Sequence, residues 1–163
     1  MTSQTLPKAA HDHHARLLDH INRIPDAADA LLTDKPDAAC GRIAEIRKFL
    51  DGTLLPHMDA AERALYPELE RMFQNRHSMA PMRREHMRIR ELVTQFGAMV
   101  DKDRGVVSLG RVLALRRVLF QLYALLKVHV AEEDAYLRIV EHGVSDDVAD
   151  AVTAALEHPV AGA

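Results

Sequence analysis

Histidine is the residue type in this chain with the clearest capacity for chemistry. The 163 residues include ten histidines, and most are dispersed along the chain rather than gathered in a tag-like run. A neutral imidazole carries a lone pair that binds transition metals, and it exchanges protons near neutral pH. The ten are His11, His13, His14, His20, His57, His77, His86, His129, His142 and His158.

Four of these histidines fall within the apolar stripes of predicted helices. Apolar residues recur around each of them at three- and four-residue steps, as on one face of a helix. A buried imidazole needs a partner for each nitrogen, so four that point inward are costly unless something organises them. One bound cation could do so. The four are His14, His57, His86 and His129.

A carboxylate accompanies the last of these histidines. Glu133 follows His129 by four residues, about 40° around a helix and about 6 Å along it, so both side chains can reach one ion or a pair. Glu132 is an alternative donor at the three-residue spacing. Tyr136 shares the same face, either as a hydrogen-bond donor to the ligands or as a core tyrosine. Helical bundles hold di-iron sites with such inward carboxylates and histidines.

The other six histidines are expected to be surface or flanking groups. His11 and His13 lie in a polar cluster near the start of the chain. His20 is six residues after His14, which turns it about 120° away from the same face. The remaining three lie near predicted helix ends or in the tail, and they are His77, His142 and His158.

Four long helices and one short helix must position these side chains. Pro25 is expected to end or kink the first near Ile24, and Pro56 and Pro67 are expected to interrupt the second. A loop is expected at residues 103–105. The predicted helices span residues 9–32, 37–74, 79–103, 108–141 and 146–156.

Amphipathic helices joined by short connections fold most simply as an up-down-up-down bundle. We therefore expect an all-α protein whose single domain covers residues 1–163. Its four-helix bundle core is expected to span about residues 10–141, followed by a short tail helix over residues 145–157.

Composition excludes several other classes of protein. Seven glycines and seven prolines are too few for a turn-rich β-fold, and a net charge of −3 argues against nucleic acid or an anionic membrane as partner. The lone Cys40 excludes an internal disulfide framework and a cysteine-based zinc or iron–sulfur site. Without a secretory signal or a long apolar run, a soluble cytoplasmic protein is expected.

Four segments together resemble the hemerythrin-like HHE cation-binding domains over about residues 10–140. Each segment is loose alone, but the four in the right order, in a chain of the right length, are specific. They are His13-His14-Ala-Arg-Leu-Leu, Leu55-Pro-His57-Met-Asp-Ala-Ala-Glu62-Arg-Ala-Leu-Tyr-Pro67, Arg84-Glu85-His86-Met-Arg-Ile-Arg-Glu-Leu92 and His129-Val-Ala-Glu-Glu133-Asp-Ala-Tyr-Leu137.

This resemblance implies a four-helix bundle with a non-haem di-iron centre. In the family a histidine comes from each helix, and the second and fourth helices each add a bridging carboxylate. Relatives bind O2 reversibly, sense oxygen or iron, or handle peroxide and nitric oxide. Carried over by position, the implied metal ligands are His14, His57, Glu62, His86, His129 and Glu133.

Two positions depart from the family pattern. The second helix has Ala61 where the family has the first glutamate of His-x-x-x-Glu-Glu-x-x-Leu-Tyr-Pro. Glu62 is kept, but it follows His57 by five residues, about 140° around an ideal helix, unless the bend near Pro56 alters that angle. Arg90 stands where O2 carriers have a second histidine. One or two ions are therefore both open, and zinc or manganese are alternatives to iron.

The expected function is that of a non-haem iron protein that binds or senses O2 or a small oxidant. No residue beyond the ligands resembles a dedicated general acid or base, so enzymatic activity stays open. Two alternatives remain. One is a degenerate bundle that acts as an interaction or regulatory module with weak or no metal binding, which Ala61 favours. The other is iron sequestration or transfer.

Overall fold

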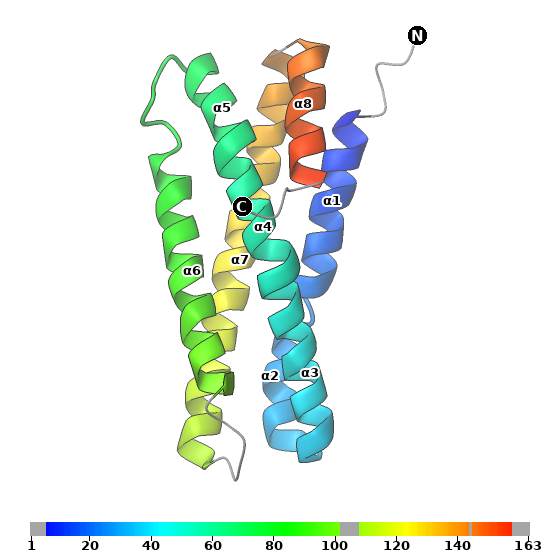
Figure 1. Cartoon of the computed structure of the whole chain (residues 1–163), viewed down its shortest axis with the longest axis vertical. Helices are drawn as coiled ribbons and strands as arrows, with labels where there is room; N and C mark the ends of the chain where they lie inside the picture. The colour runs from blue at the N-terminus through cyan, green and yellow to red at the C-terminus, as the bar shows by residue number, and fades with distance from the viewer. Residues whose placement is uncertain (1–5, 102–107, 144, 158–163) are drawn as a thin grey trace.

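The computed structural model describes residues 6–101, 108–143 and 145–157 (Figure 1). Within these residues the secondary structure is helical and contains no strand, which confirms the all-α prediction. Two π-helical turns, η1 (Leu50–Leu54) and η2 (Ala61–Leu65), interrupt the α-helical geometry. The α-helices are α1 (Leu6–Ile21), α2 (Ile24–Thr33), α3 (Pro36–Phe49), α4 (Leu55–Ala60), α5 (Tyr66–Met72), α6 (Ala80–Asp101), α7 (Leu109–Gly143) and α8 (Asp146–Glu157).

The first predicted helix is divided into α1 and α2. The break falls at Asn22 and Arg23, just before the predicted interruption near Ile24. Pro25 lies in the first turn of α2, where the missing amide proton costs no intrahelical hydrogen bond. The proline therefore starts a new helix rather than bending an old one.

The second predicted helix runs from α3 to α5 as a chain of α-helical segments joined by η1 and η2. In η1 the amide of Leu55 bonds to the carbonyl of Leu50, five residues back, and Pro56 follows at once. The same type of bond closes η2 just before Pro67. Proline lacks an amide proton and clashes with the carbonyl four residues earlier, and a wider turn relieves that clash. The predicted interruptions are therefore π turns.

The later helices agree closely with their predicted ranges. The predicted helices at 79–103, 108–141 and 146–156 correspond to α6, α7 and α8. The carbonyl of Ser108 accepts the amides of Arg111 and Val112 at the start of α7. The loop predicted at residues 103–105 lies outside the described part of the chain.

The helices lie roughly along the long axis of the molecule in Figure 1. The α7 helix packs against α1, α2 and α6, and α2 packs against α3. At the end of the molecule away from α2 and α3, α8 lies beside α1 and also contacts η2 and α4. The C-terminal helix therefore covers one end of the core. No helix in the described ranges combines the length and apolarity that crossing a membrane requires.

Two apolar clusters fill the interior, and a polar layer separates them. Along α6, His86 lies between Met82 of one cluster and Ile89 of the other. Along α7, Leu126 and Leu137 likewise belong to different clusters, with the buried His129 and Glu133 between them. Leu156 on α8 completes the cluster at the far end. The packing thus encloses the polar layer between two apolar clusters.

Candidate metal centre

Five polar side chains from four helices meet in this layer. Each is at most 2% exposed, and together they are His14 on α1, His57 on α4, His86 on α6, and His129 and Glu133 on α7. Two three-residue groups among them hold donor atoms close enough for one metal ion, and both groups contain Glu133. The structure therefore brings together five of the six residues that the sequence predicts as ligands.

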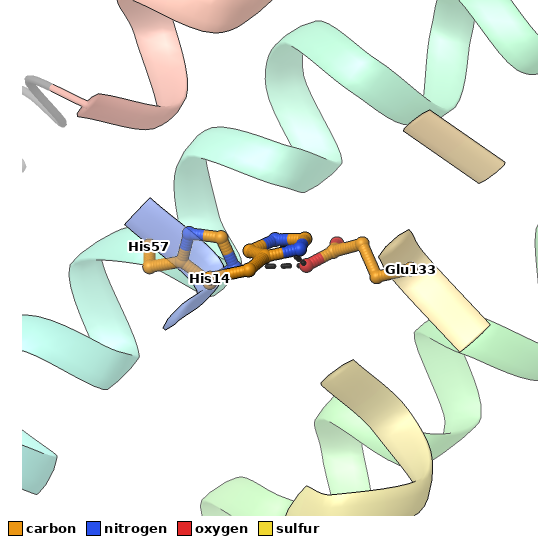
Figure 2. Close-up of side chains that lie close together, drawn as sticks. All are labelled: His14, His57 and Glu133. Carbon is orange, nitrogen blue, oxygen red and sulfur yellow. Dashed lines mark hydrogen bonds and ion pairs between the residues drawn. The ribbon is translucent and has the colours of Figure 1, made fainter. Parts of the chain in front are cut away.

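The first group consists of His14, His57 and Glu133. Figure 2 shows both imidazoles on the same side of the Glu133 carboxylate, with dashed lines that lead to it. The Nε2 of His57 lies 2.8 Å from Oε2 of Glu133, and the Nε2 of His14 lies 3.3 Å from the same oxygen. Neither ring nitrogen of His14 makes a hydrogen bond, although both are buried. A buried imidazole without a hydrogen bond at either nitrogen is costly unless a ligand occupies one of them.

The second group consists of His86, His129 and Glu133. The two imidazoles face each other, with their Nε2 atoms 3.0 Å apart. Their outer nitrogens contact carboxylates: Nδ1 of His86 lies 2.7 Å from Glu62, and Nδ1 of His129 lies 2.9 Å from Glu85. Since ionised carboxylates only accept hydrogen bonds, each Nδ1 must carry the proton of its ring.

The pKa shifts keep this proton arrangement in place. Burial and the neighbouring His129 lower the pKa of His86 to about 4, so its ring is neutral at pH 7. The hydrogen bond from His129 lowers the pKa of Glu85. Burial opposes ionisation of Glu62, but hydrogen bonds from His86 and Arg90 outweigh it and lower the pKa of Glu62. The carboxylates of Glu62 and Glu85 are therefore charged. A neutral imidazole that donates its Nδ1 proton to one of them, as His86 does, has a lone pair on its inner Nε2 atom.

Two opposed lone pairs repel each other, and a cation between them removes the repulsion. Two nitrogens bound at right angles to one ion, each at about 2.1 Å, lie about 3.0 Å apart. The separation of the His86 and His129 Nε2 atoms is 3.0 Å. The donor set therefore fits a transition metal that prefers imidazole and carboxylate ligands, and iron, zinc and manganese all belong to that class.

Glu133 connects the two groups. Burial disfavours its charge, but the imidazoles of His57, His14 and His129 outweigh that effect and hold the pKa of Glu133 well below its usual value. Its Oε2 faces the first group, while its Oε1 accepts a hydrogen bond of 3.1 Å from the hydroxyl of Tyr66. A carboxylate that offers one oxygen to each side can serve two adjacent ions.

Tyr66 is a site residue to which the sequence pattern assigns no role. Its hydroxyl also lies 3.0 Å from Nε2 of His86, and its side chain is fully buried. Burial and the charge of Glu133 raise the pKa of Tyr66 above its ordinary value, so the phenol keeps its proton. Helical periodicity does not reveal this role, because nine residues on an ideal helix place Tyr66 on the face opposite His57.

Glu62 lies outside both donor groups. Its carboxylate bonds to the outer nitrogen of His86 and to Arg90, at 2.7 and 2.9 Å, and Arg90 also pairs with Asp59. The guanidinium of Arg90 is thus neutralised and directed away from the inner nitrogens. Ala61 has only a methyl side chain and supplies no donor atom. It is completely buried in the apolar cluster beneath α8. The structure shows Glu62 in contact with His86. Direct metal binding by Glu62 stays a prediction.

His13 corrects one sequence expectation. Its place in a polar cluster predicts a solvated side chain, but it is 7% exposed and its Nε2 lies 3.1 Å from Nδ1 of His57. Burial and the neighbouring His57 and His14 lower the pKa of His13 to about 3. A signal was available, because His13 precedes the buried Leu17 by four residues and so shares its face. Glu85 was also missed, and no spacing rule distinguished it.

The remaining predicted roles divide as follows. His20 and His77 are exposed, as expected, and the ring of His20 stacks on Phe49. Glu132 is exposed and lies outside both groups. Tyr136 is half-buried in the cluster near Phe73, which supports the core interpretation. The side chains of His11 and His142, and the whole of His158, lie outside the described part of the structure.

Comparison with known proteins agrees with this geometry. The family model of the Hemerythrin HHE cation binding domain matches residues 6–137. The match spans most of the chain, so the protein belongs to this family, and the resemblance inferred from the four segments is confirmed. No curated protein and no solved structure matches the chain. The family and the two donor groups support a metal-binding, hemerythrin-like protein.

Proposed function

We propose that the protein binds non-haem iron in the polar layer and uses it to bind or sense O2 or a small oxidant. The observation that carries this proposal is the single buried carboxylate of Glu133, shared by two pairs of imidazoles. Mixed imidazole and carboxylate ligation suits iron, although zinc and manganese would also accept it. Bound iron would supply an open coordination position and a change of oxidation state.

The chain's own residues provide the environment for that ion. His14, His57, His86, His129 and Glu133 would hold it, and Glu62 and Glu85 fix the orientation of two of the imidazoles. The apolar clusters on both sides exclude water, which strengthens electrostatic interactions within the layer. The Tyr66 hydroxyl holds a proton beside Glu133 and His86.

The donor set supports two ions that share Glu133, with one ion as the alternative. Each pair of imidazoles can hold its own ion, but the second bridging carboxylate of the family is absent because Ala61 takes its place. A bridging carboxylate reduces the repulsion between two cations, so loss of one should weaken the second ion. We further propose that the chain forms one domain, an up-down-up-down four-helix bundle to which α8 is added. We also propose that the protein is located in the cytoplasm.

Iron content is the direct test. Metal-free protein would be reconstituted with iron(II) without oxygen, freed of excess metal and analysed for iron per chain, and then titrated with O2. We expect stoichiometric iron and a reversible spectral change. Protein that stays metal-free would favour the interaction or regulatory module. Iron uptake without any response to O2 would favour sequestration or transfer.

Two neighbouring glutamates supply a matched pair of variants for this test. Glu133→Gln should lower iron affinity by at least about tenfold, because it removes the charge that both groups share. Glu132→Gln, at the adjacent exposed position, should retain iron like the unmodified chain. Loss of iron in Glu132→Gln with retention in Glu133→Gln would show that Glu132, and not Glu133, is the carboxylate ligand.

A further inference from the structure

A surface groove of about 330 Å³ runs between α1 and α7. Its walls include the small side chains of Ala15 on α1 and Ala131 on α7, and Lys127 and Asp134 also line it. His14 belongs to the same lining. Because His14 is only 2% exposed, it forms the inner surface of the groove rather than its rim.

The groove therefore reaches one donor group from the outside. His14 lines it on one side and faces Glu133 on the other, with its Nε2 3.3 Å from the carboxylate. None of the other three inner histidines lines this groove. A second groove, along α6, is lined by Ala98 and Met87 among others, and it contains no inner histidine. Of these two grooves, only the one beside α1 leads to a donor.

His14 also differs from the other three imidazoles in how it is held. Residues on neighbouring helices contact the outer nitrogens of the other three: His13 for His57, Glu62 for His86 and Glu85 for His129. For His14 the corresponding atom is 3.5 Å from Asp134 and makes no hydrogen bond. Packing and the longer contacts with Glu133 and Asp134 orient this ring, so it is held less rigidly than the other three.

We propose that the groove between α1 and α7 is the route by which a small molecule reaches the ion held by His14, His57 and Glu133. This rests on the proposed function, and it assigns the open coordination position to that half of the site. The groove carries one ammonium and one carboxylate beside apolar side chains, so it imposes no strong charge selection. Because the nearly buried His14 forms its inner surface, only a small ligand with a donor atom at its end can pass to the ion.

Filling the groove tests the proposal. Ala131→Leu places a larger side chain on the α7 wall, and Ala15→Leu does so on the α1 wall. Ala98→Leu is the matched control, because it is an exposed alanine in the α6 groove. Each variant would be loaded with iron, oxidised, checked for metal content and mixed rapidly with azide. Absorbance would give the association and dissociation rate constants and the equilibrium constant Kd.

An obstructed route slows entry and exit equally. In Ala131→Leu and Ala15→Leu we expect both rate constants to fall by about tenfold with Kd unchanged, and in Ala98→Leu to stay within about twofold of the unmodified protein. Unchanged rates in both wall variants would overturn the route, as would a changed Kd with unchanged entry. A protein that holds no metal would instead refute the proposed function, so the two failures are distinguishable.

Discussion

Glu133 shows at the scale of one residue why this interior is unusual. A buried carboxylate ordinarily becomes neutral, because burial disfavours the charged form. Here the surrounding imidazoles lower the pKa of Glu133 despite complete burial. The charge and the imidazoles are therefore interdependent, and removing any one of them leaves the others without compensation.

The hydroxyl of Tyr66 contributes to that compensation. Tyr66→Phe keeps the ring packed but removes the hydrogen bond to Glu133, so the metal-free protein should lose about 1.5–3 kcal/mol of its free energy of unfolding. Urea unfolding would measure the loss. Tyr136→Phe is the control, since this half-buried side chain packs outside the donor groups, and it should cost less than about 0.5 kcal/mol. Equal losses in the two variants would contradict the role of the Tyr66 hydroxyl.

Glu62 tests whether a residue binds the metal or positions a ligand. If it orients His86, Glu62→Ala should weaken iron binding by about 10- to 100-fold, and Glu62→Gln should restore most of the affinity because its amide oxygen still accepts from Nδ1. Glu68→Ala, which removes a surface pair with Arg71, is the control. Competition with a chelator would measure the affinities. If Glu62→Gln is as weak as Glu62→Ala and loses one ion per chain, Glu62 is a direct ligand.

At the scale of elements, the π turns decide which residues reach the site. His57 and Tyr66 are nine residues apart, which on an ideal helix is about 900° and places them on opposite faces. The extra residue in η2 removes about 100° from that rotation and leaves them about 80° apart. Both side chains then reach Glu133, at 2.8 and 3.1 Å.

A π turn contains one residue more than a turn of regular α-helix, so deleting one residue should convert it to an α-helical turn. Deleting the exposed Arg63 from η2, together with Pro67→Ala to restore the missing amide, should give a regular helix with the flanking residues in register. The variant should fold, keep its iron and lose no more than about 2 kcal/mol. Circular dichroism, thermal unfolding and iron content would test this.

A deletion within a regular helix supplies the contrast. Removing the exposed Arg88 from α6 rotates the rest of that helix by about 100°, which takes Ile89 and Phe96 out of the core. That variant should fail to unfold cooperatively. If both deletions behave alike, η2 is not an inserted residue in an otherwise regular helix.

At the scale of the whole molecule, the periodicity of apolar residues predicted the helices and their inward faces, but not the contacts between helices. The helix ranges and the inward faces of His14, His57, His86 and His129 follow from apolar residues at three- and four-residue steps. The π turns could not be predicted, because proline marks an interruption without saying how the backbone accommodates it. Tyr66 was lost for that reason. Contacts such as Glu85 with His129 depend on how two helices pack, which a pattern along one helix does not contain.

Acid sensitivity is a property of the whole polar layer. The pKa values of His13 and His86 are lowered to about 3 and about 4, whereas an unfolded chain protonates histidine near 6.5. Between those values the unfolded state binds more protons, so the free energy of unfolding of the metal-free protein falls as the pH decreases from about 6.5 to about 4, by at most about 1.4 kcal/mol per pH unit for each histidine. The lowered pKa of Glu133 extends the loss below that range.

Urea unfolding of the metal-free protein at about pH 7.5 and about pH 5 would measure this dependence, which should amount to several kcal/mol. His13→Asn should reduce it, because the variant removes one of the two histidines whose protonation favours unfolding. His77→Asn, at an exposed position, should leave it unchanged. Equal stability at the two pH values would mean that the imidazoles accept protons without leaving the layer. Bound metal should raise the stability at the higher pH and steepen the dependence, because it keeps the ligating nitrogens free of protons only in the folded state and is displaced by protons as the pH falls.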